Sequence, residues 1–126
     1  MWVVRAVPNF ALVPLDIGHT ETDGIAVISV AGRLMQGPEG AQLERLVKDL
    51  LGKGVRKLVF DFAELKHVDS TGIGRCISSL NMVMQAGGRL HVAGATGQVR
   101  ESFRVTQLDR VFRFFDDVPA ATAAFG

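Results

Sequence analysis

The chain has 126 residues, of which 48% are hydrophobic and 21% charged, with a formal net charge of +1. This length suits one domain with its own core and is short for two. The near-neutral charge gives no basic footprint, so we expect no nucleic-acid partner. No apolar run approaches the roughly 20 residues that cross a bilayer, so we expect no direct membrane insertion. The single cysteine, Cys76, cannot form an internal disulfide, which agrees with a cytoplasmic location.

The chain begins with a weakly patterned stretch that is followed by a hairpin. Residues 1–13 have no clear period and are interpreted as a leader or an extra edge strand, whereas residues 14–126 form the predicted domain. Apolar residues alternate with polar ones over 15–19, and a β-rich run follows over 25–31. The Asp-Gly pair between these runs predicts a tight turn that joins two antiparallel strands.

Beyond the hairpin, helical and strand patterns alternate. Apolar residues between Leu43 and Leu51 recur at helical spacing, and the apolar run 57–62 predicts a strand buried on both faces. This alternation predicts an α/β fold: one domain with a mixed, mostly parallel sheet of four or five strands and about four packed helices. The predicted elements are helix 43–51, strand 57–62, helix 70–86, strand 89–93, helix 97–106, strand 112–114 and a helix after Asp117.

Groups that could catalyse a reaction are dispersed along the chain. His19, His67 and His91 fall in three separate predicted elements, and none belongs to a metal-binding motif such as His-Glu-x-x-His. Cys76 lies on the apolar stripe of its helix, where a buried side chain is favoured over a nucleophile. Asp61 ends a strand as a phospho-acceptor would, but no paired carboxylates follow the earlier strands. We therefore expect no enzymatic activity, no metal site and no cofactor.

The hexapeptide from Asp69 to Gly74, Asp-Ser-Thr-Gly-Ile-Gly, follows a strand-like run and opens a helix. Asp69 suits the N-cap position, which by itself is a structural role. Gly72 and Gly74 are poorly explained by helix formation, because each costs the helix about 1 kcal/mol relative to alanine. Two glycines in a first turn predict that another backbone or a partner approaches closely. The helix dipole also makes this end a favourable place for a phosphate.

This stretch resembles the signature of STAS domains, a family named after sulphate transporters and anti-sigma factor antagonists. The resemblance covers about residues 25–125 and implies the fold predicted above. It is carried by the strand 59–62 and the segment 68–74, and it is supported by the glycine turn 32–34, the helix end and strand 87–90, and the segment 108–114.

The resemblance implies a protein-binding switch. In antagonists of this family, a partner anti-sigma factor that is also a serine kinase phosphorylates the serine after the aspartate, which is Ser70 here. The unmodified form binds the kinase and releases the sigma factor, the phosphorylated form does not bind, and a phosphatase would reset the switch. Thr71 is the competing acceptor. The implied partner-binding residues are Asp69, Thr71, Gly72, Ile73, Gly74, Arg75, Met35 and Gln36.

Met35 departs from the family pattern. Many antagonists carry an aspartate directly after a Gly-x-Leu turn, where it contributes to kinase contact, and this chain has Met35 there. The apolar replacement would suit a more hydrophobic partner, or it would fold back onto the core. Both interpretations stay open.

Two other functions also stay open. A STAS subunit of an ABC-type lipid transport complex would bind its ATPase without phosphorylation. A small-ligand or nucleotide sensor would be stabilised against melting by its ligand. We expect the domain to be a monomer or a weak dimer.

Overall fold

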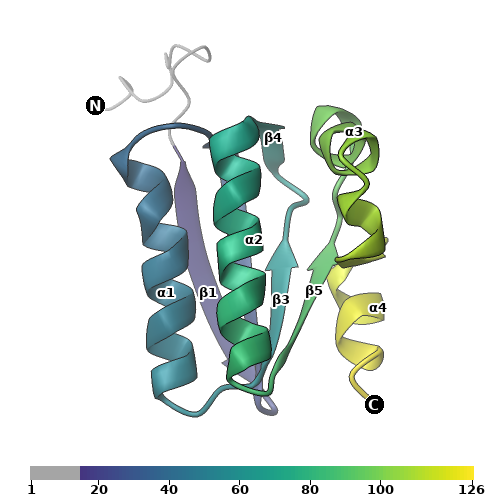
Figure 1. The fold of residues 1–126 in the computed structure, drawn as a ribbon. Helices are drawn as coiled ribbons and strands as arrows, with labels where there is room; N and C mark the ends of the chain where they lie inside the picture. The colour runs from purple at the N-terminus through teal and green to yellow at the C-terminus, as the bar shows by residue number, and fades with distance from the viewer. Residues whose placement is uncertain (1–14) are drawn as a thin grey trace, which may run out of the picture.

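The computed structural model describes residues 15–126, and Figure 1 shows how their helices and strands are arranged. The predicted leader or extra edge strand, residues 1–13, lies outside the described residues. Its interpretation, and with it the predicted domain boundary, therefore stays a prediction.

A mixed sheet forms the centre of the fold. β1 (Asp16–Thr22) and β2 (Ile25–Leu34) are antiparallel, and β2, β3 (Lys57–Asp61), β5 (Arg89–Ala93) and β6 (Arg113–Phe115) are parallel to one another. Their order across the sheet is β1-β2-β3-β5-β6. The parallel neighbours are joined through helices, as expected for crossover connections. The predicted α/β class with a mixed, mostly parallel sheet is confirmed.

The hairpin between β1 and β2 closes on Asp23 and Gly24. Both residues have positive φ angles, 56° and 79° respectively. A two-residue loop with positive φ at both positions matches the twist of the flanking strands, and it favours the sequence Asp-Gly. The predicted hairpin is therefore confirmed together with the chemistry of its turn.

Helices cover both faces of the sheet. Three of them, α1 (Ala41–Gly52), α2 (Ser70–Gln85) and α3 (Gly97–Val105), contribute to the larger hydrophobic core on one face. The short α4 (Val118–Ala123) packs on the opposite face, against a smaller cluster. Two single-turn 3-10 helices, η3 (Pro38–Gly40) and η4 (Leu108–Arg110), complete the connections.

β3 is buried on both faces, as its continuous apolar sequence predicted. Leu58 and Phe60 belong to the larger core beneath α1 and α2, and both are fully buried. Val59 points the other way and packs with Ala121 and Phe125 of the C-terminal segment. The central strand therefore joins the two layers, which is the position of a core strand in an α/β sheet.

The structure contains a sixth strand, β4 (Leu65–Val68), between the predicted strand 57–62 and the predicted helix 70–86, where no strand was predicted. The β-rich run predicted over 25–31 is also too short, because β2 continues to Leu34. The end of β2, from Gly32 to Leu34, pairs with β4 in place of β3, and an irregularity between Gly32 and Arg33 shifts the register within this pairing. β4 has buried residues only at its two ends, so it lacks the alternation by which a strand is recognised.

Candidate functional site

Ser70 is the first residue of α2, at the end of the sheet where β2 and β4 finish side by side. Ser70 and its neighbour Thr71 are both exposed. Asp69 precedes them in an extended conformation and caps the helix. The predicted helix start is confirmed, and it leaves two hydroxyl groups within reach of another protein.

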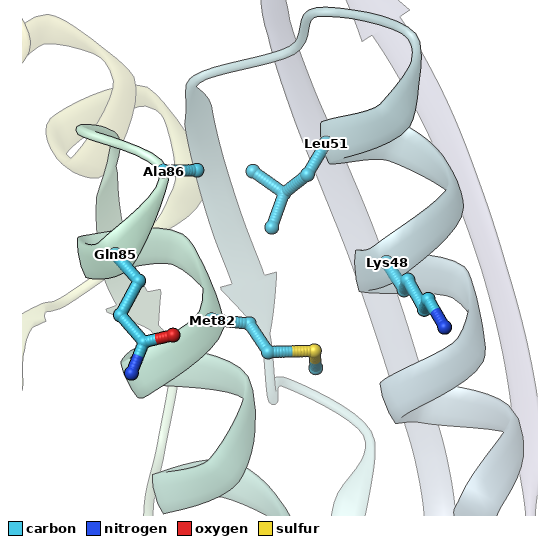
Figure 2. A pocket seen from close by; sticks show the side chains of 5 residues that line it. All are labelled: Lys48, Leu51, Met82, Gln85 and Ala86. Atoms are coloured by element: carbon cyan, nitrogen blue, oxygen red, sulfur yellow. The ribbon is translucent and has the colours of Figure 1, made fainter.

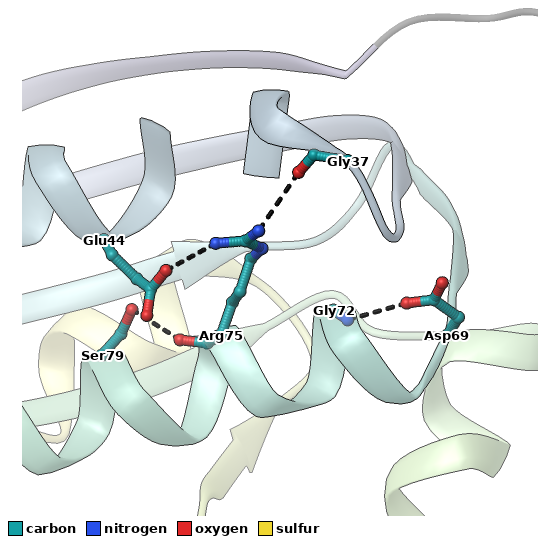
Figure 3. A network of polar contacts seen from close by, with 6 residues as sticks. All are labelled: Gly37, Glu44, Asp69, Gly72, Arg75 and Ser79. Carbon is teal, nitrogen blue, oxygen red and sulfur yellow. Dashed lines mark hydrogen bonds and ion pairs between the residues drawn. The ribbon is translucent and has the colours of Figure 1, made fainter. Parts of the chain in front are cut away.

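The Asp69 carboxylate joins two segments that are distant in sequence. Its Oδ1 accepts a hydrogen bond of 2.8 Å from the backbone N–H of Gly72, in the first turn of α2 (Figure 3). Its Oδ2 accepts a bond of 2.9 Å from the backbone N–H of Gln36, in the loop after β2. Asp69 is therefore more than an N-cap, because it also holds the Gln36 loop against the helix start.

The two glycines of the first turn have different surroundings. A Cβ atom at Gly72 would lie 2.1 Å from the carbonyl oxygen of Leu34 and 2.7 Å from Cγ2 of Val68. At Gly74 a Cβ atom would meet nothing within 4 Å, and the residue is exposed. The predicted close backbone approach is confirmed at Gly72, where the chain itself makes it. Gly74 has no such contact inside the described part of the protein.

Arg75 connects α2 to α1 and to the η3 loop. Its Nη1 donates a hydrogen bond of 2.7 Å to Oε1 of Glu44, and its Nη2 donates one of 3.1 Å to the carbonyl oxygen of Gly37 (Figure 3). Gly40 makes room for this side chain, because a Cβ atom there would lie 2.6 Å from Arg75 Nε. The guanidinium group therefore fastens the loop at one end, and Asp69 fastens it at the other.

Gln98, a residue of α3, fastens the strand that leads into Ser70. Its side-chain amide donates a 2.9 Å hydrogen bond to the carbonyl oxygen of Val68 and accepts a 3.0 Å bond from the N–H of the same residue. The backbone of Val68, at the end of β4, thus gains its hydrogen-bond partner from a side chain in place of another strand. Gln98 was not predicted as part of the site, because nothing in the sequence links it to a residue 30 positions earlier.

The loop with Met35 and Gln36 lies at the same end of the molecule as Ser70. Met35 is partly buried, and its Sδ atom lies 3.4 Å from both Nε and Nη2 of Arg33. Gln36 is exposed and is placed by its bond to Asp69. Half-burial leaves part of the Met35 side chain available to a partner.

Cys76 and His91 are both buried and contribute to the packing of the fold. Cys76 is fully buried in the core, and desolvation, assisted by the negative charge of Glu44, raises its pKa to about 12. Nδ1 of His91 donates a 2.9 Å hydrogen bond to the carbonyl oxygen of Ala121, and its ring stacks on Phe125 with centroids 3.9 Å apart. Within residues 15–126, no three His, Cys, Asp or Glu side chains are placed to hold a metal ion.

Comparison with known proteins identifies the fold. The model of the STAS domain matches residues 17–121, which is most of the chain. The chain belongs to the STAS domain family. A Bordetella bronchiseptica protein named as a candidate anti-sigma factor antagonist, BtrV, is 26% identical over 103 residues, which cover 82% of this chain and 88% of that protein.

Solved structures share the architecture of this STAS domain. The crystal structure of an anti-sigma factor antagonist from Mycobacterium paratuberculosis matches with a TM-score of 0.78 at 20% identity, over 88% of this chain and 93% of that one. The phosphorylated form of SpoIIAA from Bacillus matches with a TM-score of 0.66 at 17% identity, over 88% of this chain and 99% of that one. At these identities the likeness concerns the fold.

The fold of this STAS domain gathers the implied partner-binding residues at one end. Among them Thr71, Gly74 and Gln36 are exposed, whereas Gly72 and Ile73 are buried and contribute shape more than side-chain contact. Their role in binding stays a prediction. No helix in the described part of the chain is long and apolar enough to span a membrane.

Proposed function

We propose that this protein is an anti-sigma factor antagonist that binds an anti-sigma factor, itself a serine kinase, through the Ser70 end of α2. Phosphorylation of Ser70 switches binding off, and a phosphatase restores it. The observation that carries the proposal is the exposed hydroxyl of Ser70 at the first position of α2, beside the loop of Met35 and Gln36 that Asp69 holds in place. The names of the STAS relatives support the same role.

The fold of the phosphorylated protein should resemble that of the unmodified one. Phosphorylation adds about −1.5 to −2 charges at neutral pH. Ser70 is exposed, so the phosphate stays hydrated, and the positive end of the α2 dipole attracts it. The Asp69 carboxylate is a like charge next to it and offsets part of this attraction. The two effects act in opposite directions on an exposed group, so the stability should change little.

Phosphorylation should instead weaken the binding of the partner. A partner that covers the first turn of α2 would have to remove water from a doubly charged group. That desolvation costs several kcal/mol unless the partner supplies a cation at the same point. Since a tenfold change in affinity corresponds to about 1.4 kcal/mol, even part of this penalty would weaken binding at least about tenfold.

The proposal is tested by affinity purification from host lysate with Ser70→Ala and Ser70→Asp as baits, and with mass spectrometry to identify the partners. We expect Ser70→Ala to retain an ATP-binding anti-sigma factor kinase and Ser70→Asp to lose it. Thr20→Asp is the matched charge control, because Thr20 is exposed on the edge strand β1. It should retain the partner.

The recovered kinase then identifies the acceptor. Incubated with ATP, it should phosphorylate the wild type and Thr71→Ala but not Ser70→Ala. Recovery of the same transporter ATPase by both Ser70 baits would overturn the switch and favour a STAS subunit of an ABC-type lipid transport complex. A rise in melting temperature on adding nucleotide to the isolated protein would favour a sensor instead.

A further inference from the structure

A shallow groove with an apolar floor runs between α1 and α2, at the end of the helices that lies away from Ser70. It has a volume of about 460 Å³. Leu51, Met82 and Ala86 lie along it, and Lys48 and Gln85 stand exposed at its rims (Figure 2). We call this surface the helix groove.

The helix groove exists because α1 and α2 contact each other differently at their two ends. Near Ser70, the ion pair between Arg75 and Glu44 spans the gap. At the opposite end the facing side chains are apolar, and the small Ala86 leaves space between the helices. Leu51 and Met82 pack partly on the core and keep an exposed side. Such a surface gains free energy when an apolar segment covers it.

Residues 1–14 have the composition of such a segment. Ten of these fourteen residues are hydrophobic, and Arg5 is the single charged side chain among them. They include Trp2, which is the only tryptophan of the chain. An apolar stretch of this kind costs free energy when water surrounds it, so it favours a surface to cover.

The segment is long enough to reach the groove. It joins the described structure at Leu15, next to Asp16, which pairs with Ala31 near the end of β2. That is the Ser70 end of the molecule. The distance along α2 from Ser70 to Met82 is about 18 Å at 1.5 Å per residue. The thirteen steps from Trp2 to Leu15 span up to about 43 Å when extended, which exceeds this distance even with the ~10 Å diameter of a helix added.

We propose that the apolar segment of residues 1–14 docks into the helix groove of its own chain, with the Trp2 indole over Leu51 and Met82. A thioether beside an aromatic ring and a rim ammonium group such as Lys48 are both favourable neighbours for an indole. Docking would bury the Trp2 indole against α1 and α2. This proposal does not rest on the proposed function.

The intrinsic fluorescence of the chain can be used to measure this docking. Because it has one tryptophan and no tyrosine, its intrinsic fluorescence comes from the segment that is proposed to dock. We expect the full-length wild type to emit at a shorter wavelength than a peptide of residues 1–14. We also expect acrylamide to quench the fluorescence of the full-length protein less. Met82→Gln should shift the emission to the red. Met84→Gln is the matched control, since Met84 lies on the same helix, is 61% exposed and does not line the groove.

Equal emission from the wild type and the peptide, or equal effects of Met82→Gln and Met84→Gln, would overturn the proposal. A second test applies if Met82→Gln fails to fold. Val3→Cys with Gln85→Cys should form a disulfide within one chain under mild oxidation, whereas Val3→Cys with Thr20→Cys should not. The native Cys76 is fully buried and stays out of this reaction. Cross-linked dimers, or equal yields from the two pairs, would show that the segment does not dock in its own groove.

Discussion

Replacing Gly72 by alanine should destabilise the protein, although alanine is the better helix former. The new Cβ atom would lie 2.1 Å from the Leu34 carbonyl oxygen and 2.7 Å from Val68 Cγ2, so α2 must move away from β2 and β4. Overpacking of this kind costs about 1–3 kcal/mol. The movement also strains the Asp69 cap, worth about 1 kcal/mol, while the gain in helix propensity is about 1 kcal/mol. The net loss is about 2 kcal/mol.

Gly74→Ala is the matched control for Gly72→Ala. Nothing lies within 4 Å of a Cβ atom there, so Gly74→Ala should keep the propensity gain and stabilise the protein by up to about 1 kcal/mol. Urea denaturation followed by far-ultraviolet circular dichroism measures both. Gly72→Ala should also lower the melting temperature by about 8 °C for a domain of this size. Unchanged stability of Gly72→Ala, or shifts of equal sign in the two variants, would refute the argument.

Three further predictions concern buried or bridging groups. Asp69→Ala should cost about 2 kcal/mol, because it removes both the cap and the bond from the Gln36 N–H, and hydrogen exchange of that N–H should speed up. Cys76 should resist alkylation in the native protein and react on unfolding, since its pKa is about 12; prompt native labelling would contradict its burial. Burial lowers the pKa of His91 in the folded protein, so its contribution to stability should be full above pH ~6.5 and lost as the pH falls through the folded value. His91→Asn, without a titrating ring but able to donate to the Ala121 carbonyl, should flatten that part of the pH profile of the unfolding free energy.

The fold was largely predictable because the signals that specify it are local. The Asp-Gly turn, the helical spacing from Leu43 to Leu51 and the continuous apolar run of β3 each lie within one short segment. β4 was missed for the opposite reason. Its partner is the end of β2, more than thirty residues earlier, and its own four residues show no alternation.

The position of the candidate site could be predicted from the sequence, but the long-range contacts that hold it together could not. Sequence alone placed Asp69 as a cap and Ser70 at a helix start, because capping chemistry is a matter of adjacent residues. It could not show that Asp69 also holds Gln36, or that Arg75, included among the partner-binding residues, is engaged with Glu44 and Gly37. These contacts join residues more than thirty positions apart.

The two glycines in the first turn of α2 show what the sequence determines and what the tertiary structure adds. The sequence by itself determined that Gly72 and Gly74 are both costly in a helix and that something must compensate, since propensity acts residue by residue. Only the tertiary structure decided that the Leu34 carbonyl oxygen requires a glycine at one position and that open space surrounds the other. The physical reason is that steric exclusion depends on which distant backbone lies a few ångströms away, and packing of β2 and β4 against α2 sets that distance.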